Sequence, residues 1–269
     1  MIKRIMKYSL YILCLILSSS LGLSAQGEWT ALQQRLQSKD SSELCVLHLG
    51  DSHLSGGYMT SPIIQALHQR FGTERIRIER FGIPGATYAT FTAEKHLKRL
   101  REINADLIII SLGTNDSYSK RFNPETLRFN MEHLISLISR GQQRKPMFVL
   151  TTPPLSYLRQ RVQTGTRRGK RRRRIPVYGT QYHYNRSAEQ AAQTIVSFAQ
   201  RQGYAYYDLT SAIAEGNGAE AANRWLSMGL LHIDRVHYTR AGYDRIGKMV
   251  ATALQELLDS KLKNDSRSL

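Results

Sequence analysis

The sequence ELCVLHLGDSHLSGGY, at residues 43–58, places a short apolar run directly before a glycine-rich turn. A continuous apolar run of this length that is bounded by turn residues is typical of a buried β-strand. A helix is predicted next, with Ser61 as its N-cap, Pro62 at its first position and Gly72 at its end. The segment therefore predicts a strand, a turn and a helix in succession.

The same alternation continues along the chain. Four more strands are predicted, at residues 75–80 (RIRIER), 106–112 (DLIIISL), 147–152 (MFVLTT) and 204–209 (YAYYDL), with apolar residues at helical spacing between them. The last helix is predicted to start at Thr239 and to run through Leu257. Strands that alternate with helices indicate a parallel sheet with right-handed crossovers and helices on both faces. We expect an α/β fold: a single three-layer α/β/α domain with a parallel sheet of about five strands.

The composition excludes several classes of protein. The chain has 269 residues, of which 41% are hydrophobic and 22% charged, so it is not wholly disordered, collagen-like or mucin-like. Its two cysteines, Cys14 and Cys45, cannot build a disulfide framework, and neither has a partner at zinc-ligand spacing. A disulfide scaffold and metal-thiolate chemistry are therefore excluded.

Positive charge is concentrated in one segment. The formal net charge is +17, and residues 159–174 (RQRVQTGTRRGKRRRR) hold nine Lys and Arg residues without an acid. We expect a basic loop insertion at residues 158–180. This loop could hold an anionic polymer, with Tyr157, Tyr178, Tyr182 and Tyr184 stacking on sugars; a solvated loop without a partner is an equal alternative.

The N-terminal 25 residues predict export. A basic start (MIKRIMK) precedes an apolar run that ends in small residues, and a cleavage point follows Ala25. We expect a signal peptide at 1–25, a single domain at 26–262 and a tail at 263–269. The mature protein is then periplasmic or secreted and keeps no stable membrane span.

Small and polar residues follow the predicted strands. Ser52 lies in the glycine-flanked turn after the first strand, Gly82 and Gly85 follow the second strand, and Asn115 follows the third. The carboxyl ends of parallel strands meet at one edge of the sheet, where active groups lie in such folds. We therefore expect these residues to lie close together.

A histidine and an acid precede the last helix. In HIDRVHYT, Asp234 stands three residues before His237 and can orient its imidazole. That imidazole can take a proton from Ser52 and return it to a leaving group, while an N–H at Gly85 and the Asn115 amide can meet an oxyanion. The competing histidines and acids are interpreted as structural: His48, His53 and His232 as packing or rim residues, and Asp51 and Asp116 as acceptors for loop N–H groups.

These blocks, in this order, resemble the SGNH (GDSL-type) hydrolase family over nearly the whole mature chain. The first block is GDSH here, without the leucine of the family pattern. The resemblance implies a flavodoxin-like SGNH hydrolase fold with a catalytic Ser52, Asp234 and His237, and an oxyanion hole of Ser52, Gly85 and Asn115. Gly82 remains the alternative glycine for the second block.

The resemblance implies a serine esterase that works through an acyl-enzyme and needs no metal or organic cofactor. Within the family, the chain resembles bacterial members that act on O-acetyl groups of peptidoglycan or other polysaccharides. The features that it shares with them are export, the TTPPLSY segment and the basic insertion. The substrate is then an acylated small molecule or polysaccharide, most simply a short-chain acetyl ester.

Two alternatives stay open. An O-acyltransferase would use the same acyl-enzyme, and an anionic-polymer-binding protein would keep the site only as a vestige. Nucleic acid is a poor candidate for the polymer, because the basic cluster is confined to one loop and the sequence holds no nucleic-acid-binding motif.

Overall fold

The computed structural model describes residues 32, 34–35, 43–119, 121–142, 144–169 and 173–265. The signal peptide expected at 1–25 lies outside these residues. The last helix runs to Asp265 and so enters the segment expected as a tail, whose residues 266–269 also lie outside the described part.

A five-stranded, all-parallel sheet forms the centre of the molecule, with the strand order β2-β1-β3-β4-β7. Its strands are β1 (Leu44–Gly50), β2 (Ile76–Gly82), β3 (Leu107–Ser111), β4 (Met147–Thr151) and β7 (Ala205–Tyr207). The α/β prediction is therefore confirmed. Strand β7 is shorter than its apolar run because Asp208 caps the next helix, accepting a hydrogen bond from the Ser211 N–H.

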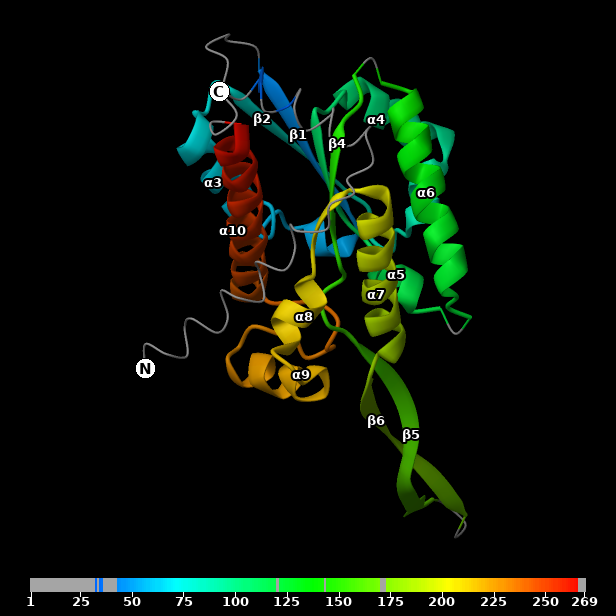
Figure 1. The fold of residues 1–269 in the computed structure, drawn as a ribbon. Coiled ribbons are helices and arrows are strands. Elements are labelled where there is room, and N and C mark those ends of the chain that lie inside the picture. The colour runs from blue at the N-terminus through cyan, green and yellow to red at the C-terminus, as the bar shows by residue number, and fades with distance from the viewer. Residues whose placement is uncertain are drawn as a thin grey trace.

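Helices cover both faces of the sheet, as Figure 1 shows. The helices are α3 (Ser61–Phe71), α4 (Glu94–Ile103), α5 (Thr114–Ser117), α6 (Pro124–Arg140), α7 (Arg186–Gln202), α8 (Leu209–Ala214), α9 (Gly218–Ser227) and α10 (Arg240–Asp265), with short 3₁₀ turns η2 (Ser52–Leu54) and η3 (Tyr88–Thr92). One core packs the sheet against α3, α8, α9 and α10, and the other packs it against α4, α6 and α7. The three-layer arrangement is thus confirmed.

Side chains of a strand point alternately to the two faces of the sheet. Because helices cover both faces, the central strands are apolar at nearly every position. In β3, Leu107 and Ile109 face the first core, whereas Ile108 and Ile110 face the second. Cys45 in β1 is also buried, and burial raises the pKa of its thiol to about 11, so it acts as a small core residue.

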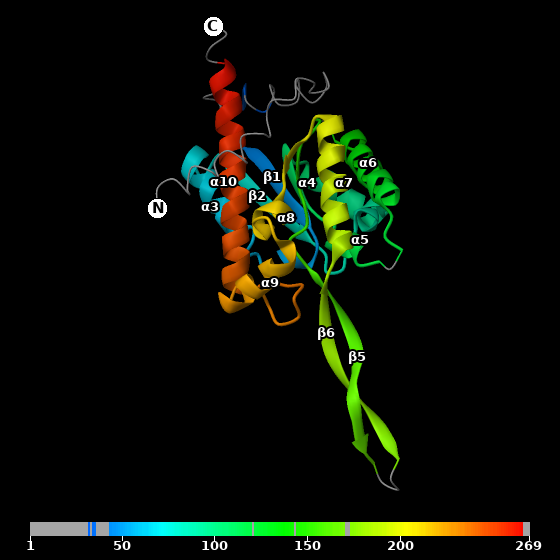
Figure 2. The ribbon, with the colours of Figure 1, turned by 60° about the horizontal axis from the view of Figure 1, so that its bottom comes forward.

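The basic insertion is not a loop. Residues 157–168 and 174–184 form an antiparallel ribbon of β5 (Tyr157–Arg168) and β6 (Arg174–Tyr184), which we call the hairpin. Figures 1 and 2 show it projecting away from the body of the protein. The loop prediction was wrong because the density of arginine hid the β-forming residues Val162, Ile175 and Val177 between them.

Membrane-spanning helices are not found in the described part of the chain: none of its helices combines the length and the apolarity that a bilayer crossing requires.

A buried histidine links the strands beneath the site. His48 is fully buried in β1, with Nδ1 3.0 Å from Thr60 Oγ1 and Nε2 2.9 Å from Ser111 Oγ, and Thr151 Oγ1 donates to the same Ser111 oxygen. Burial, together with the charge of Arg80, lowers the pKa of His48 to about 3. His48 is therefore neutral in the folded protein at neutral and mildly acid pH.

This neutral imidazole should make stability depend on pH. Unfolding returns His48 to its ordinary pKa near 6.5, so its contribution is complete above that pH and is lost as the pH falls toward 3. Between pH 7 and pH 5 we expect His48 to account for a loss of about 2 kcal/mol in the free energy of unfolding. Urea unfolding at both pH values measures it. His48→Gln should lack this part of the loss and the exposed His133→Gln should keep it; an equal loss in both variants would contradict the assignment.

Candidate active site

The turn after β1 is built to present Ser52. The Asp51 side chain is buried and accepts a hydrogen bond from the His53 N–H at 3.0 Å, which fixes the start of η2. Gly50 has no room for a side chain, because a Cβ there would lie 2.7 Å from Leu54 Cδ1 and from the Ser111 carbonyl oxygen. Ser52 itself stays partly exposed. The backbone is therefore fixed while the hydroxyl remains accessible.

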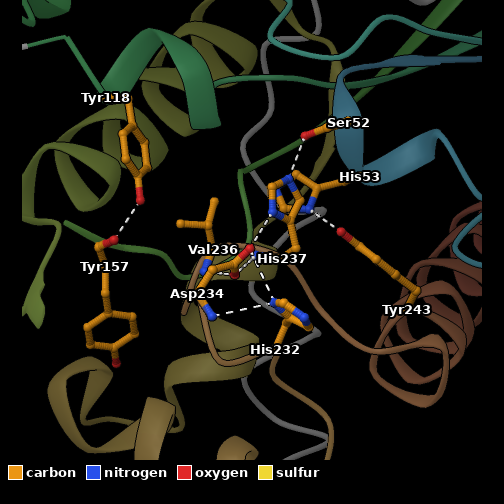
Figure 3. A network of polar contacts seen from close by, with 9 residues as sticks. All are labelled: Ser52, His53, Tyr118, Tyr157, His232, Asp234, Val236, His237 and Tyr243. Carbon is orange, nitrogen blue, oxygen red and sulfur yellow. Dashed lines mark hydrogen bonds and ion pairs between the residues drawn. The ribbon is translucent and has the colours of Figure 1, made fainter. Parts of the chain in front are cut away.

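Ser52, His237 and Asp234 form a continuous chain of contacts, shown in Figure 3. Ser52 Oγ lies 3.0 Å from His237 Nε2, and His237 Nδ1 lies 2.9 Å from Asp234 Oδ2. The serine follows β1 and the other two precede α10, so 185 positions of sequence separate the serine and the histidine. The structure thus brings together the three residues that the sequence singled out as nucleophile, base and orienting acid.

The loop that carries Asp234 and His237 is closed on itself. Leu231 and Tyr238 form an isolated β-bridge, and the His232 N–H donates to the His237 carbonyl at 2.9 Å. The other carboxylate oxygen of Asp234 accepts the N–H groups of Val236 and His237, each at 2.9 Å. We call residues 231–238 the base loop.

Asp234 is ionised over a wide pH range. Its partial burial acts to raise its pKa, but the hydrogen bonds from the His237 ring and from the Val236 and His237 N–H groups outweigh that effect and lower the pKa to about 2. A carboxylate in this state holds the imidazole with Nδ1 protonated and leaves Nε2 free to accept a proton.

A second imidazole touches the same carboxylate. His232 Nδ1 lies 3.3 Å from Asp234 Oδ2 and 3.4 Å from the Asp234 backbone nitrogen (Figure 3). The sequence interpretation of His232 as a packing or rim residue does not include this contact. The missed signal was the His-x-Asp spacing, which a tight turn brings into contact.

His53 faces away from the serine hydroxyl. Its Nδ1 lies 3.0 Å from the Tyr243 hydroxyl, and its ring centroid is 5.6 Å from that of His237. Burial lowers the pKa of His53, which keeps this ring neutral. A neutral, packed imidazole beside His237 adds no competing positive charge to the site.

Two backbone N–H groups at the site are unused. Within the described part of the chain, neither the Ser52 nor the Gly85 N–H has a hydrogen-bond acceptor. Gly85 has a φ of 77°, in the left-handed region, and open space where a side chain would be. Gly82 differs, since a Cβ there would lie 2.8 Å from Leu54 Cβ. Gly82 thus packs against the turn that carries Ser52, whereas Gly85 lies in an open loop.

Asn115, in α5, links the turns that follow β1 and β2. Its Nδ2 donates to the Ala86 carbonyl at 3.0 Å and to Asp51 Oδ2 at 3.2 Å. Both amide hydrogens therefore have acceptors, and donation to a substrate oxygen would replace the longer bond, to Asp51. Asn115 lies at the sheet edge where it was predicted, but its contact with Asp51 has no signal in the sequence.

Asp116 supports the same edge from behind. Its Oδ1 accepts the Tyr88 N–H at 3.3 Å, which agrees with its interpretation as a loop acceptor. Burial raises the pKa of Asp116 to about 7 against the effect of that hydrogen bond, and the nearby Asp51 charge adds to the rise. Among the described residues, no group of three or more His, Cys, Asp and Glu side chains is placed to hold a metal ion.

Comparison with known proteins gives the family. The model of the GDSL-like lipase/acylhydrolase family matches residues 48–245, which include all the site residues above. No curated protein sequence matches the chain.

Solved structures of esterases share the fold. A peptidoglycan O-acetylesterase aligns with a TM-score of 0.67 at 16% identity, covering 88% of this chain and 97% of its own. The acetylxylan esterase Axe2 from Geobacillus stearothermophilus aligns at 0.55 and 16%, covering 82% and 96%. The acetyl xylan esterase AlAXEase aligns at 0.54 and 18%, covering 80% and 99%. These likenesses confirm the fold, and the match over most of the chain shows that it belongs to the GDSL-like lipase/acylhydrolase family, and so to the carboxylic ester hydrolases.

Proposed function

We propose that the protein is a serine esterase that hydrolyses short-chain acetyl esters through a covalent acyl-enzyme. The observation that carries this proposal is the unbroken chain from Ser52 Oγ through the His237 ring to the ionised Asp234, with contacts of 3.0 and 2.9 Å. This arrangement is the one that nucleophilic acyl transfer requires.

The reaction follows from these contacts. His237 Nε2 takes the proton of Ser52 as its oxygen attacks the ester carbonyl, and the Asp234 carboxylate stabilises the imidazolium that forms. The N–H groups of Ser52 and Gly85 and the Asn115 amide stabilise the oxyanion, at about 3 kcal/mol for each donor in comparable sites. The imidazolium then protonates the leaving alcohol. Water, activated by the same imidazole, releases the acid and restores Ser52.

We propose an O-acetylated polysaccharide as the natural substrate. Two kinds of protein with this fold support it, since one is named a peptidoglycan O-acetylesterase and others are acetyl xylan esterases. Both names describe removal of acetyl groups from a carbohydrate polymer. The reaction center described here needs only an acetyl ester that can reach the partly exposed Ser52.

We also propose that residues 1–25 are a signal peptide and that residues 26–262 form one exported domain. The support is the basic start, the apolar run and the small residues before Gln26. An exported enzyme would meet cell-wall or extracellular polysaccharide directly.

Replacing the proposed nucleophile tests the mechanism. In Ser52→Ala, hydrolysis of a short-chain aryl acetate should fall by at least about 10⁴-fold, because no hydroxyl remains to form the acyl-enzyme. Thermal unfolding should be unchanged. Ser55→Ala, on the exposed end of the same turn, is the matched control and should keep full activity. An unchanged rate in Ser52→Ala would refute the nucleophile assignment.

Asn115→Ala tests the oxyanion donors. We expect kcat to fall by about 10²- to 10³-fold with little change in KM, because the donor acts mainly on the transition state. Asn123→Ala removes the side chain that caps α6 and should lower stability without lowering kcat. If Asn115→Ala loses only stability, Asn115 holds the turns together and is not an oxyanion donor.

Cleavage of the signal peptide can be read from the mature chain. When the full sequence is expressed in a bacterial host, N-terminal sequencing of the exported protein should begin at Gln26. Recovery of the intact chain from the cytoplasm, starting at Met1, would contradict the proposal.

A further inference from the structure

The hairpin is a long arm whose root is anchored to the body of the protein. Its strands have 12 and 11 residues, which corresponds to a length of about 35 Å. At the root, the rings of Tyr157 and Tyr184 pack 5.6 Å apart. The Tyr157 hydroxyl donates to the Gly218 carbonyl at 2.6 Å and accepts the Ala222 N–H at 3.0 Å. Two of the four tyrosines that the sequence assigned to polymer binding are therefore anchors.

Strand pairing gives the hairpin two different faces, because residues opposite each other in an antiparallel pair share a face. Arg159 pairs with Tyr182 and Arg161 with Thr180, and Tyr178 follows on the same side. We call the surface of Arg159, Arg161, Tyr178 and Tyr182 the Tyr/Arg face. The opposite, aliphatic face carries Leu158, Val162, Ile175 and Val177, with Arg167 paired to Ile175.

Arginines are stacked on the tyrosines of the Tyr/Arg face. The Arg161 guanidinium lies 4.1 Å from the Tyr178 ring centroid, and the Arg235 guanidinium lies 4.8 Å from the Tyr182 ring centroid. Stacking orders a guanidinium but leaves its N–H donors free for a carboxylate. In the part of the hairpin that the structure describes, no arginine forms an ion pair with a carboxylate, so this positive charge is not neutralised by the described residues.

The Tyr/Arg face begins at the base loop. Arg235, which stacks on Tyr182, directly follows Asp234 in sequence, and its carbonyl accepts the Tyr157 N–H at 3.0 Å. Figure 3 shows Tyr157 and Tyr118 beside the catalytic residues, and the Tyr118 hydroxyl donates to the Tyr157 carbonyl at 2.5 Å. A polymer lying along this face would therefore pass next to the Ser52 site.

We propose that the Tyr/Arg face binds an acidic polysaccharide and delivers its acetyl esters to Ser52. The esterase step rests on the function proposed above. The positive charge of the hairpin favours an anionic partner. The exposed ring of Tyr178 offers a surface on which a sugar ring can stack. Because the Tyr/Arg face continues into the base loop, the partner should also carry the acetyl ester that Ser52 attacks. A nucleic acid or a lipid surface meets the first condition but brings no acetyl ester to the site.

Direct binding tests the proposal without catalysis. The Ser52→Ala protein is mixed with polygalacturonate as the acidic glycan, xylan as the neutral glycan, a single-stranded oligonucleotide, or anionic phospholipid vesicles. Polygalacturonate should bind in a salt-dependent way and more tightly than the other three probes. Equal binding of xylan, or tighter binding of the oligonucleotide or the vesicles, would overturn the assignment of the partner.

Matched variants separate the face from the charge. Arg161→Ser and Arg167→Ser each remove one arginine, but only the first belongs to the Tyr/Arg face. Arg161→Ser and Tyr178→Ala should each weaken polygalacturonate binding by about 5- to 10-fold. Arg167→Ser and Val177→Ala should change it by less than about 2-fold. Equal effects on both faces would mean a diffuse charge attraction and would overturn the proposal.

Turnover shows whether binding serves the esterase. In the protein with an intact Ser52, Tyr178→Ala and Arg161→Ser should raise KM for acetylated pectin and leave kcat unchanged, while aryl acetate hydrolysis stays at its normal rate. Deleting residues 159–182 and joining Leu158 to His183 through an Asn-Gly turn removes the whole Tyr/Arg face, keeps the Leu158–His183 pair, and should raise KM for acetylated pectin further than either single substitution. Polygalacturonate binding without any esterase activity would refute the function proposed above but leave the binding role of the Tyr/Arg face standing. A loss of aryl acetate hydrolysis in the deletion variant would mean that the hairpin is part of the active site and would overturn its role as a separate binding surface.

Discussion

The site depends on the register of the parallel strands around β1. Gly50 at the end of β1 lies level with Gly82 at the end of β2 on one side and with Ser111 at the end of β3 on the other. The chain leaves the sheet at these three points, and Ser52, Gly85 and Asn115 follow within a few residues. A slip of one residue in either pairing would exchange the two faces of a strand and separate the turns that Asn115 joins.

The residues at this edge divide into those that hold the turns and those left free for chemistry. Asp51, Gly50 and Gly82 are fixed by close packing or by hydrogen bonds to the backbone. The Ser52 and Gly85 N–H groups keep their hydrogens unpaired within the described chain. These two N–H groups are therefore available to an acceptor that the described chain does not supply.

Much of this architecture could be predicted from the sequence, because its signals are local. Apolar runs such as the one at 106–112 located the strands, and the spacing of Asp234 and His237 located the base loop. The hairpin could not be predicted, because the many arginines conceal the alternating β-forming residues in the two strands, at residues 157–168 and 174–184, which pair with each other. The contacts of His232 and Asn115 with neighbouring carboxylates were also hidden, since both depend on how turns close.

The two ends of the Ser52–His237–Asp234 chain of contacts are held by unequal numbers of interactions. Ser52 leaves a central strand that is paired on both sides, whereas His237 lies in the base loop, which one isolated bridge and a few backbone contacts hold in place. Segments with few such contacts open at lower free energy than the sheet does. Heating should therefore separate the His237 imidazole from the Ser52 hydroxyl before the sheet unfolds. The enzyme would then lose its activity reversibly at temperatures where its circular dichroism spectrum is still native.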